Sequence, residues 1–150
     1  MQAVKAILEA PPLSNFDIDD ALVNIKGYRG CFPKDSLPRK IKRKEYTVIN
    51  LDDTGNPGTH WVCIVNQPEF DFVEYFDPFG IMPSTEIYKY MKTAGKYIRF
   101  NDNQLQDIYS IRCGYFCCHY ITERSGGKTP LNVLYDLTQT PSAYNENIIL

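Results

Sequence analysis

Two apolar runs, residues 60–66 and 71–76, constrain the fold of this 150-residue chain more than any other feature. Both carry apolar side chains at successive as well as alternate positions, a pattern typical of strands that are covered on both faces. The short segment between them, residues 67–70, contains a proline and polar residues and therefore predicts an antiparallel hairpin. We expect this hairpin to lie inside a sheet with helices packed against it.

The remaining elements are predicted from periodicity and from capping residues. Further strands are predicted at 46–51 and near 96–100, with helices at 14–26, 84–94 and 111–124 and a last short helix from residue 129 onward. Residues 33–46 are charged and flanked by proline, which favours a loop or an edge. Short strands and separate helices of this kind predict a single α+β domain over residues 1–150.

Composition excludes several classes of protein. The chain is 43% apolar and 13% aromatic, enough for a packed core, and its net charge of −2 argues against wholesale nucleic-acid binding. The longest apolar run, residues 61–65, is too short to span a membrane, and Lys5 and Glu9 interrupt the stretch that a secretory signal needs. Five cysteines without regular spacing predict reduced thiols. We therefore expect a non-secreted protein that contacts no membrane.

The hairpin register brings a histidine beside a carboxylate. If the loop is 67–70, paired residues sum to 137, and His60 lies opposite Asp77 at the open end of the hairpin. A carboxylate beside an imidazole fixes its tautomer and favours its charged form, as catalytic chemistry requires. A purely structural hydrogen bond between the two side chains is the alternative.

The helix at 111–124 supplies a candidate nucleophile. Ser110 is a plausible N-cap, which would make Cys113 the third helical residue, where unpaired backbone N–H groups and the helix dipole stabilise a thiolate. Cys117 lies one turn deeper on the predicted buried stripe, so we expect it to pack in the core. His119 has no evident partner and is expected to be structural. The stripe itself consists of Cys113, Phe116, Cys117, Tyr120 and Ile121.

A glutamine precedes this helix. Gln106 stands seven residues before Cys113, and its side-chain amide could join the Cys113 backbone N–H in binding an oxyanion. Gln104 is equally within reach, and a solvated loop glutamine is the ordinary interpretation of either residue.

Taken together, these residues resemble the adenovirus maturation protease (adenain) family, and in particular its relatives in Maverick/Polinton elements and virophages. The resemblance covers about residues 14–124. Its motifs are Gly58–Trp61, Tyr75–Gly80, Gln106 with Ser110, and Cys113–Cys118, with Asp35–Pro38 and Val48–Asp53 shared with the Polinton and virophage relatives.

The resemblance implies a permuted papain-like cysteine protease domain, in which a central mixed or antiparallel sheet packs against the helix that carries the nucleophile. It implies an endopeptidase that cleaves viral capsid and other structural precursors, often at Gly-Gly sites. The family's functional residues match His60, Asp77, Gln106 and Cys113, and the family's spacing favours Gln106 over Gln104. Asp77 stands where the adenovirus enzyme has glutamate, and the chain is shorter at its C-terminus.

The resemblance also sets expectations for partners. We expect a monomer that acts in the virion and the infected host cell, with no metal and no cofactor. The adenovirus enzyme is stimulated by DNA and by a capsid-derived peptide, for which the sequence identifies no docking site. A basic run is compatible with weak DNA contact, although a solvated charged edge is the simpler interpretation. The run comprises Lys40, Lys42, Arg43 and Lys44.

Two other functions remain open at this point. A protease that deconjugates SUMO-like or ubiquitin-like modifiers shares the fold and the order of the four residues. A small zinc-stabilised interaction module could use His60, Cys63 and the cysteines of residues 113–118. In a strand, however, residues three apart face opposite sides, which disfavours His60 and Cys63 as ligands of one ion.

Overall fold

The computed structural model describes residues 12–52, 60–102, 104 and 112–138. Within these ranges the chain forms one five-stranded mixed sheet in the order β1-β2-β3-β4-β5. The three central strands pair antiparallel, and the two edge strands, β1 and β5, each pair parallel to their neighbour. The strands are β1 (Tyr28–Pro33), β2 (Glu45–Asn50), β3 (Trp61–Asn66), β4 (Phe72–Phe76) and β5 (Tyr97–Phe100).

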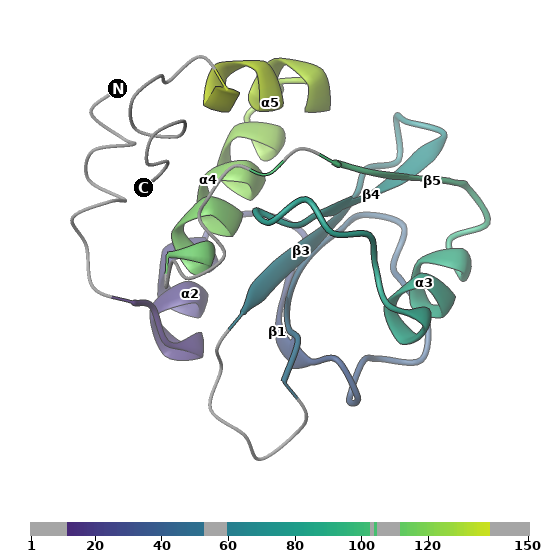
Figure 1. Cartoon of the computed structure of the whole chain (residues 1–150). Helices are drawn as coiled ribbons and strands as arrows, with labels where there is room; N and C mark the ends of the chain where they lie inside the picture. Colours follow the sequence, from purple (N-terminus) through teal and green to yellow (C-terminus); the bar gives the residue numbers. More distant parts are fainter. Residues whose placement is uncertain (1–11, 53–59, 103, 105–111, 139–150) are drawn as a thin grey trace.

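Helices cover both faces of this sheet (Figure 1). One face packs against α2 (Asn15–Leu22), α4 (Cys113–Ser125) and α5 (Pro130–Thr138), and the other packs against α3 (Thr85–Lys92). Every residue of β2 and β3 is buried as a result. The prediction of an α+β domain with a doubly covered sheet is therefore confirmed. Each described helix is too short or too polar to cross a bilayer.

The helix caps explain where three of the helices begin or end. Ser14 caps α2 through a capping box with Asp17, and Ser84 caps α3 by accepting a hydrogen bond from the Ile87 N–H. The chain leaves α4 at Gly126, as the glycine pair following Ser125 predicts. Helix α2 ends at Leu22, four residues before the predicted boundary.

The start of α4 differs from the prediction. Arg112 is the N-cap and makes no side-chain capping bond, so Cys113 is the first helical residue and not the third. Ser110, the predicted cap, lies outside the described residues. The position still belongs to the first turn, where N–H groups lack helical partners and the dipole favours negative charge. All five residues of the predicted stripe are buried, which confirms the face that α4 turns to the sheet.

Two details of the sheet were not predicted correctly. Strand β1 was not predicted, and its register against β2 shifts between Tyr28 and Gly30, which has a φ of +132°. In the hairpin, Asn66 pairs with Val73, so paired residues sum to 139 and the connection is two residues longer than predicted. The two additional residues, Asp71 and Phe72, lie before the first residue of β4 that pairs with β3. Gln67 begins the connection as predicted, and its buried amide donates to the Tyr46 hydroxyl and to the Arg124 carbonyl.

Candidate active site

Three element ends meet at the candidate site. His60 directly precedes β3, Asp77 directly follows β4, and Cys113 begins α4. Because β3 and β4 run antiparallel, the start of one lies beside the end of the other. A register error of two residues keeps side chains on the same face, so the predicted proximity of His60 and Asp77 is still found.

The imidazole of His60 is held on one edge and one face. Its Nε2 donates to Asp77 Oδ1 over 2.8 Å, and only 12% of the His60 side chain and 1% of the Asp77 side chain are exposed. The ring stacks on Phe79 with centroids 3.9 Å apart and planes 1° from parallel. This bond and this stacking together fix both the direction and the plane of the imidazole.

A tight turn after β4 aims the carboxylate. The Gly80 N–H donates to the Asp77 carbonyl over 2.8 Å, and the Phe79 N–H donates to Asp77 Oδ1 over 2.8 Å. Proline at the second turn position presets φ, and the positive φ of Gly80, +75°, suits a residue without a Cβ. Asp77 Oδ1 therefore accepts from both the imidazole and its own turn.

The thiol of Cys113 lies against the residue that follows His60. The Trp61 N–H donates to Cys113 Sγ over 3.1 Å, and Cys117 Sγ donates to the Trp61 carbonyl over 3.4 Å. Gly114 permits this approach, because a Cβ there would lie 3.3 Å from Trp61 Cδ1. The thiol of Cys113 is only 1% exposed and carries a backbone donor that can stabilise its anion.

The surroundings of His60 favour the imidazolium. Burial lowers the pKa of His60, but the hydrogen bonds and charges of Asp77 and Cys113 outweigh it and raise the pKa to about 9. Since Nε2 is bonded to Asp77, Nδ1 is the ring nitrogen left to interact with the Cys113 thiol. An imidazolium held between a carboxylate and a thiol can serve as a general acid and base.

The other candidate residues fall in different places. Gln106 lies outside the described residues, whereas Gln104 is exposed. Cys117 is fully buried, which confirms its place in the core. Burial lowers the pKa of His119, which is half-buried on α4; its predicted structural role stays a prediction.

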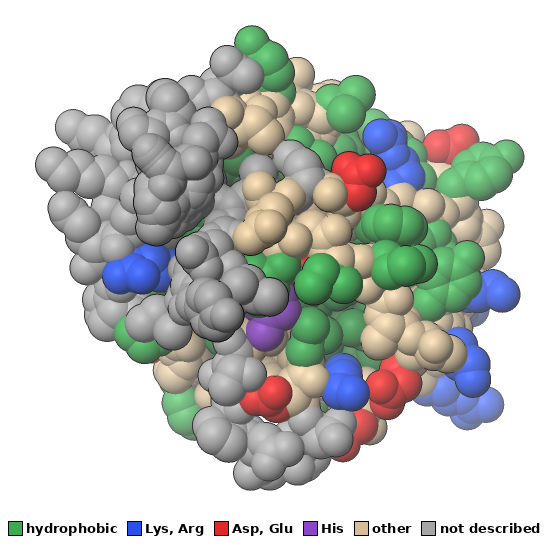
Figure 2. Space-filling view, viewed as in Figure 1, with side chains coloured by type: hydrophobic (Ala, Val, Ile, Leu, Met, Phe, Trp, Pro, Cys, Tyr) green, Lys and Arg blue, Asp and Glu red, His purple; other side chains and the backbone are tan. Residues whose placement is uncertain are grey.

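The basic run and the zinc alternative gain no support from the arrangement. The four cations of the run, Lys40, Lys42, Arg43 and Lys44, are all exposed. In the view of Figure 2, most visible Lys and Arg side chains lie toward the side that carries α3 and β5. No group of three or more His, Cys, Asp or Glu side chains that could hold a metal ion occurs among the described residues.

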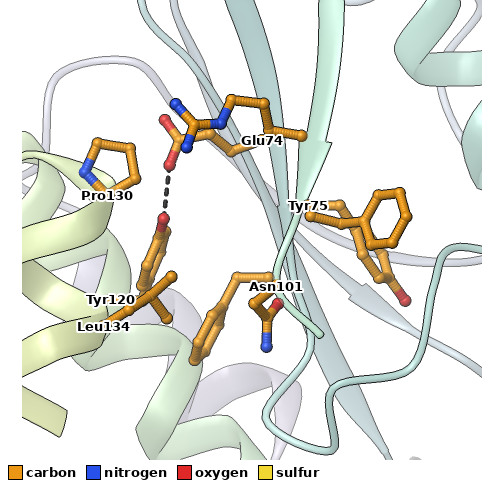
Figure 3. Close-up of a pocket in the computed structure, with 9 residues that line it drawn as sticks. Glu74, Tyr75, Asn101, Tyr120, Pro130 and Leu134 are labelled. Carbon is orange, nitrogen blue, oxygen red and sulfur yellow. Dashed lines mark hydrogen bonds between the residues drawn. The ribbon is translucent and has the colours of Figure 1, made fainter. Parts of the chain in front are cut away.

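A buried ionic network joins the C-terminal half of α4 to the sheet. Glu74 of β4 accepts from the Tyr120 hydroxyl over 2.6 Å and forms a buried ion pair with Arg124. A small cavity of about 40 Å³ adjoins this network, and Asn101 lies across it from Glu74 (Figure 3). Asn101, which the sequence analysis did not single out, hydrogen-bonds to Asp77; its only sequence signal was an amide directly after a predicted strand.

Comparison with solved structures identifies the fold of the chain. The chain has the fold of a papain-like viral cysteine protease: two crystal structures of the pS273R protease of African swine fever virus match it with a TM-score of 0.62. The matches cover 89% of this chain at 15% and 16% sequence identity. This chain covers 64% and 63% of the two protease chains, slightly less than two thirds.

Comparisons at the level of sequence give no match. Neither a protein-family model nor a curated protein matches the chain. The evidence for a cysteine protease fold comes from the structural neighbours. The assignment to adenain or Polinton relatives remains a resemblance of motifs.

Proposed function

We propose that this chain is a viral or virus-like cysteine endopeptidase that processes capsid and other structural precursors. The observation that carries the proposal is the position of His60, bonded to Asp77 through Nε2 while its other nitrogen is left for the Cys113 thiol. The arrangement occurs on a fold whose solved neighbours are cysteine proteases, which supports a peptidase.

The first half of the reaction forms a thioester. The Cys113 thiolate, at the positive end of α4, attacks the scissile carbonyl carbon and forms a C–S bond while the carbonyl oxygen becomes an oxyanion. The Cys113 N–H and, by family resemblance, the Gln106 amide stabilise that oxyanion. The C–N bond then breaks, and the His60 imidazolium gives its proton to the leaving amine.

The second half regenerates the enzyme. His60, now neutral, accepts a proton from water as the water oxygen attacks the thioester carbon. The C–S bond breaks, and the carboxylic product leaves a thiolate beside an imidazolium. Asp77 stays ionised throughout and orients the ring, which its bond to Nε2 allows.

Incubation of the full chain with candidate capsid precursors, with and without a thiol alkylator, tests the proposal. We expect alkylator-sensitive cleavage, with sites near Gly-Gly sequences when the products are read by mass spectrometry. Cys113→Ala should abolish cleavage and fold normally. Cys117→Ala is the matched control, because it removes a thiol one turn away and should leave most of the activity.

Two results would redirect the proposal. Cleavage of a Gly-Gly-terminated ubiquitin-like conjugate with no cleavage of capsid precursors would favour the deconjugating function. Cleavage by the Cys113→Ala variant would exclude this mechanism. Metal analysis of the purified chain tests the zinc-stabilised alternative, for which stoichiometric zinc is the required result.

The finer features of the proposal rest on the resemblance alone. We propose action in the virion and infected cell as a monomer, with at most weak DNA contact through the exposed basic run. Cleavage rates measured over a range of salt concentrations, with and without DNA, test that contact, since phosphate contacts weaken steeply as salt rises. A cleavage rate that DNA does not change at low salt would exclude a functional DNA contact.

A further inference from the structure

We infer that Asn101 is a positioning residue, which holds the Asp77 carboxylate against His60 by fixing the backbone of Asp77. This inference deepens the proposed function and rests on it for its catalytic meaning. Asn101 directly follows β5, and only 7% of its surface is exposed. Nothing in its own chemistry makes it a proton donor or a nucleophile at neutral pH.

The Asn101 amide bonds to both backbone groups of Asp77. Asn101 Oδ1 accepts from the Asp77 N–H over 2.9 Å, and Asn101 Nδ2 donates to the Asp77 carbonyl over 2.7 Å. The planar amide therefore grips one peptide unit on each side of the Asp77 Cα. The Asn101 amide thus replaces the backbone carbonyl and N–H that a neighbouring strand would offer to Asp77.

This contact is needed because the ladder ends there. The last pair of β4 and β5 in register is Tyr75 with Phe100, two residues before Asp77 on one strand and one residue before Asn101 on the other. Asp77 is 1% exposed, so its N–H cannot turn to water for a partner. Asn101 replaces the missing ladder bonds with side-chain bonds at the point where the chain must leave the sheet.

Fixing the backbone also fixes the carboxylate. Asp77 has only two side-chain torsions, and its Oδ1 is already bound to the His60 Nε2 and the Phe79 N–H. With the Cα held by Asn101, the carboxylate lies where the imidazole meets it without a search over backbone conformations. Both of these Asn101 bonds go to the backbone of Asp77, so Asn101 acts on the imidazole through Asp77.

A merely structural role is the alternative, and Gln67 offers a matched control for it. Gln67 is also a buried amide after a strand, 6% exposed, and it donates to the Tyr46 hydroxyl and the Arg124 carbonyl. It lies at the end of β3, whereas His60 lies before the start of the same strand. Removing either amide should lower stability, but only the loss of Asn101 should change the environment of His60.

The experiment is an NMR titration of the histidines in the full chain, its Asn101→Ala variant and its Gln67→Ala variant. The chain has two histidines, so His119 on α4 serves as an internal reference. In Asn101→Ala we expect the pKa of His60 to fall by about one unit, a tenfold change in its protonation equilibrium, with His119 unchanged. In Gln67→Ala we expect both histidines to titrate as in the unmodified chain.

Activity measurements test whether Asn101 also affects catalysis. Asn101→Ala should lower kcat about tenfold or more with little change in KM, because Asp77 acts on the imidazole and not on substrate binding. If Asn101→Ala is poorly folded, Asn101→Leu keeps the side-chain volume while removing both hydrogen bonds. An unshifted His60 pKa in a folded variant, or failure of both variants to fold where Gln67→Ala folds, would overturn the inference and leave Asn101 structural.

Failure of the proposed function would look different. An unmodified chain that cleaves no precursor would remove the protease, but the titration needs no substrate and would still report whether Asn101 holds Asp77 against His60. A chain that cleaves normally while Asn101→Ala keeps both the His60 pKa and kcat would remove the inference and leave the protease.

Discussion

Replacing Asp77 by asparagine should remove a measurable pH dependence of stability. The substitution keeps an oxygen that can accept from the Phe79 N–H but removes the negative charge beside His60. In the unmodified protein the pKa of His60 is about 9, against about 6.5 in an unfolded chain. In Asp77→Asn, burial still lowers the pKa of His60 and the charge of Asp77 no longer opposes it.

The sign and size follow from linkage. A histidine whose folded-state pKa is raised contributes stability that is complete below about pH 6.5 and lost as the pH rises through about 9. Between about pH 6.5 and about pH 8 the loss from His60 amounts to roughly 1.5 kcal/mol of the free energy of unfolding. The window stays below the ordinary thiol pKa of about 8.5, where the cysteines of the unfolded chain begin to contribute.

Urea denaturation of both proteins at the two pH values measures this loss. His119 is common to both, so its opposite contribution cancels in the comparison. The stability difference between the unmodified protein and Asp77→Asn should shrink by roughly 1.5 kcal/mol as the pH rises from about 6.5 to about 8. A difference that is equal at both pH values would refute the assigned ion pair between Asp77 and His60.

Three further substitutions test contacts of α4 and of the segment that follows it. Gly114→Ala should lower stability by about 1–3 kcal/mol in urea denaturation, because its Cβ would lie 3.3 Å from both Leu13 Cβ and Trp61 Cδ1; unchanged stability would mean that α4 can move away. Arg124→Met should cost about 3–5 kcal/mol by the same assay, since it leaves Glu74 buried without its cation, and a small loss would show that water enters. Lys128→Gln, at an exposed ion pair, should leave the urea midpoint nearly unchanged, and a large shift would contradict its exposure.

Local patterns predicted most of the fold and the proximity of the site residues. Apolar runs gave β2 to β4, and the stripe on α4 is a direct result of helical spacing. The prediction that His60 and Asp77 lie close together survived the register error, because a shift of two residues keeps side chains on the same face of the sheet. The boundary between Asn66 and Gln67 was predicted correctly, and the register error lies on the β4 side, where Asp71 and Phe72 precede the first residue that pairs with β3.

The errors came from interactions between distant segments. Strand β1 is a parallel edge strand whose partner comes more than ten residues later, and Gly30 with Pro33 hides its pattern. The role of Asn101 depends on the point where two parallel strands stop pairing, which no local pattern contains. Gln106 keeps its status as a prediction from spacing and resemblance.

The two sulfur contacts with Trp61 have a mechanical consequence. Cys113 and Cys117, one helical turn apart, engage the N–H and the carbonyl of the same residue, so α4 is attached to the start of β3 at two points. Sliding or rotating the helix along its axis would have to break both attachments together. Because His60 is covalently joined to that residue, the contact that holds the nucleophile of α4 also holds the start of the strand beside the base.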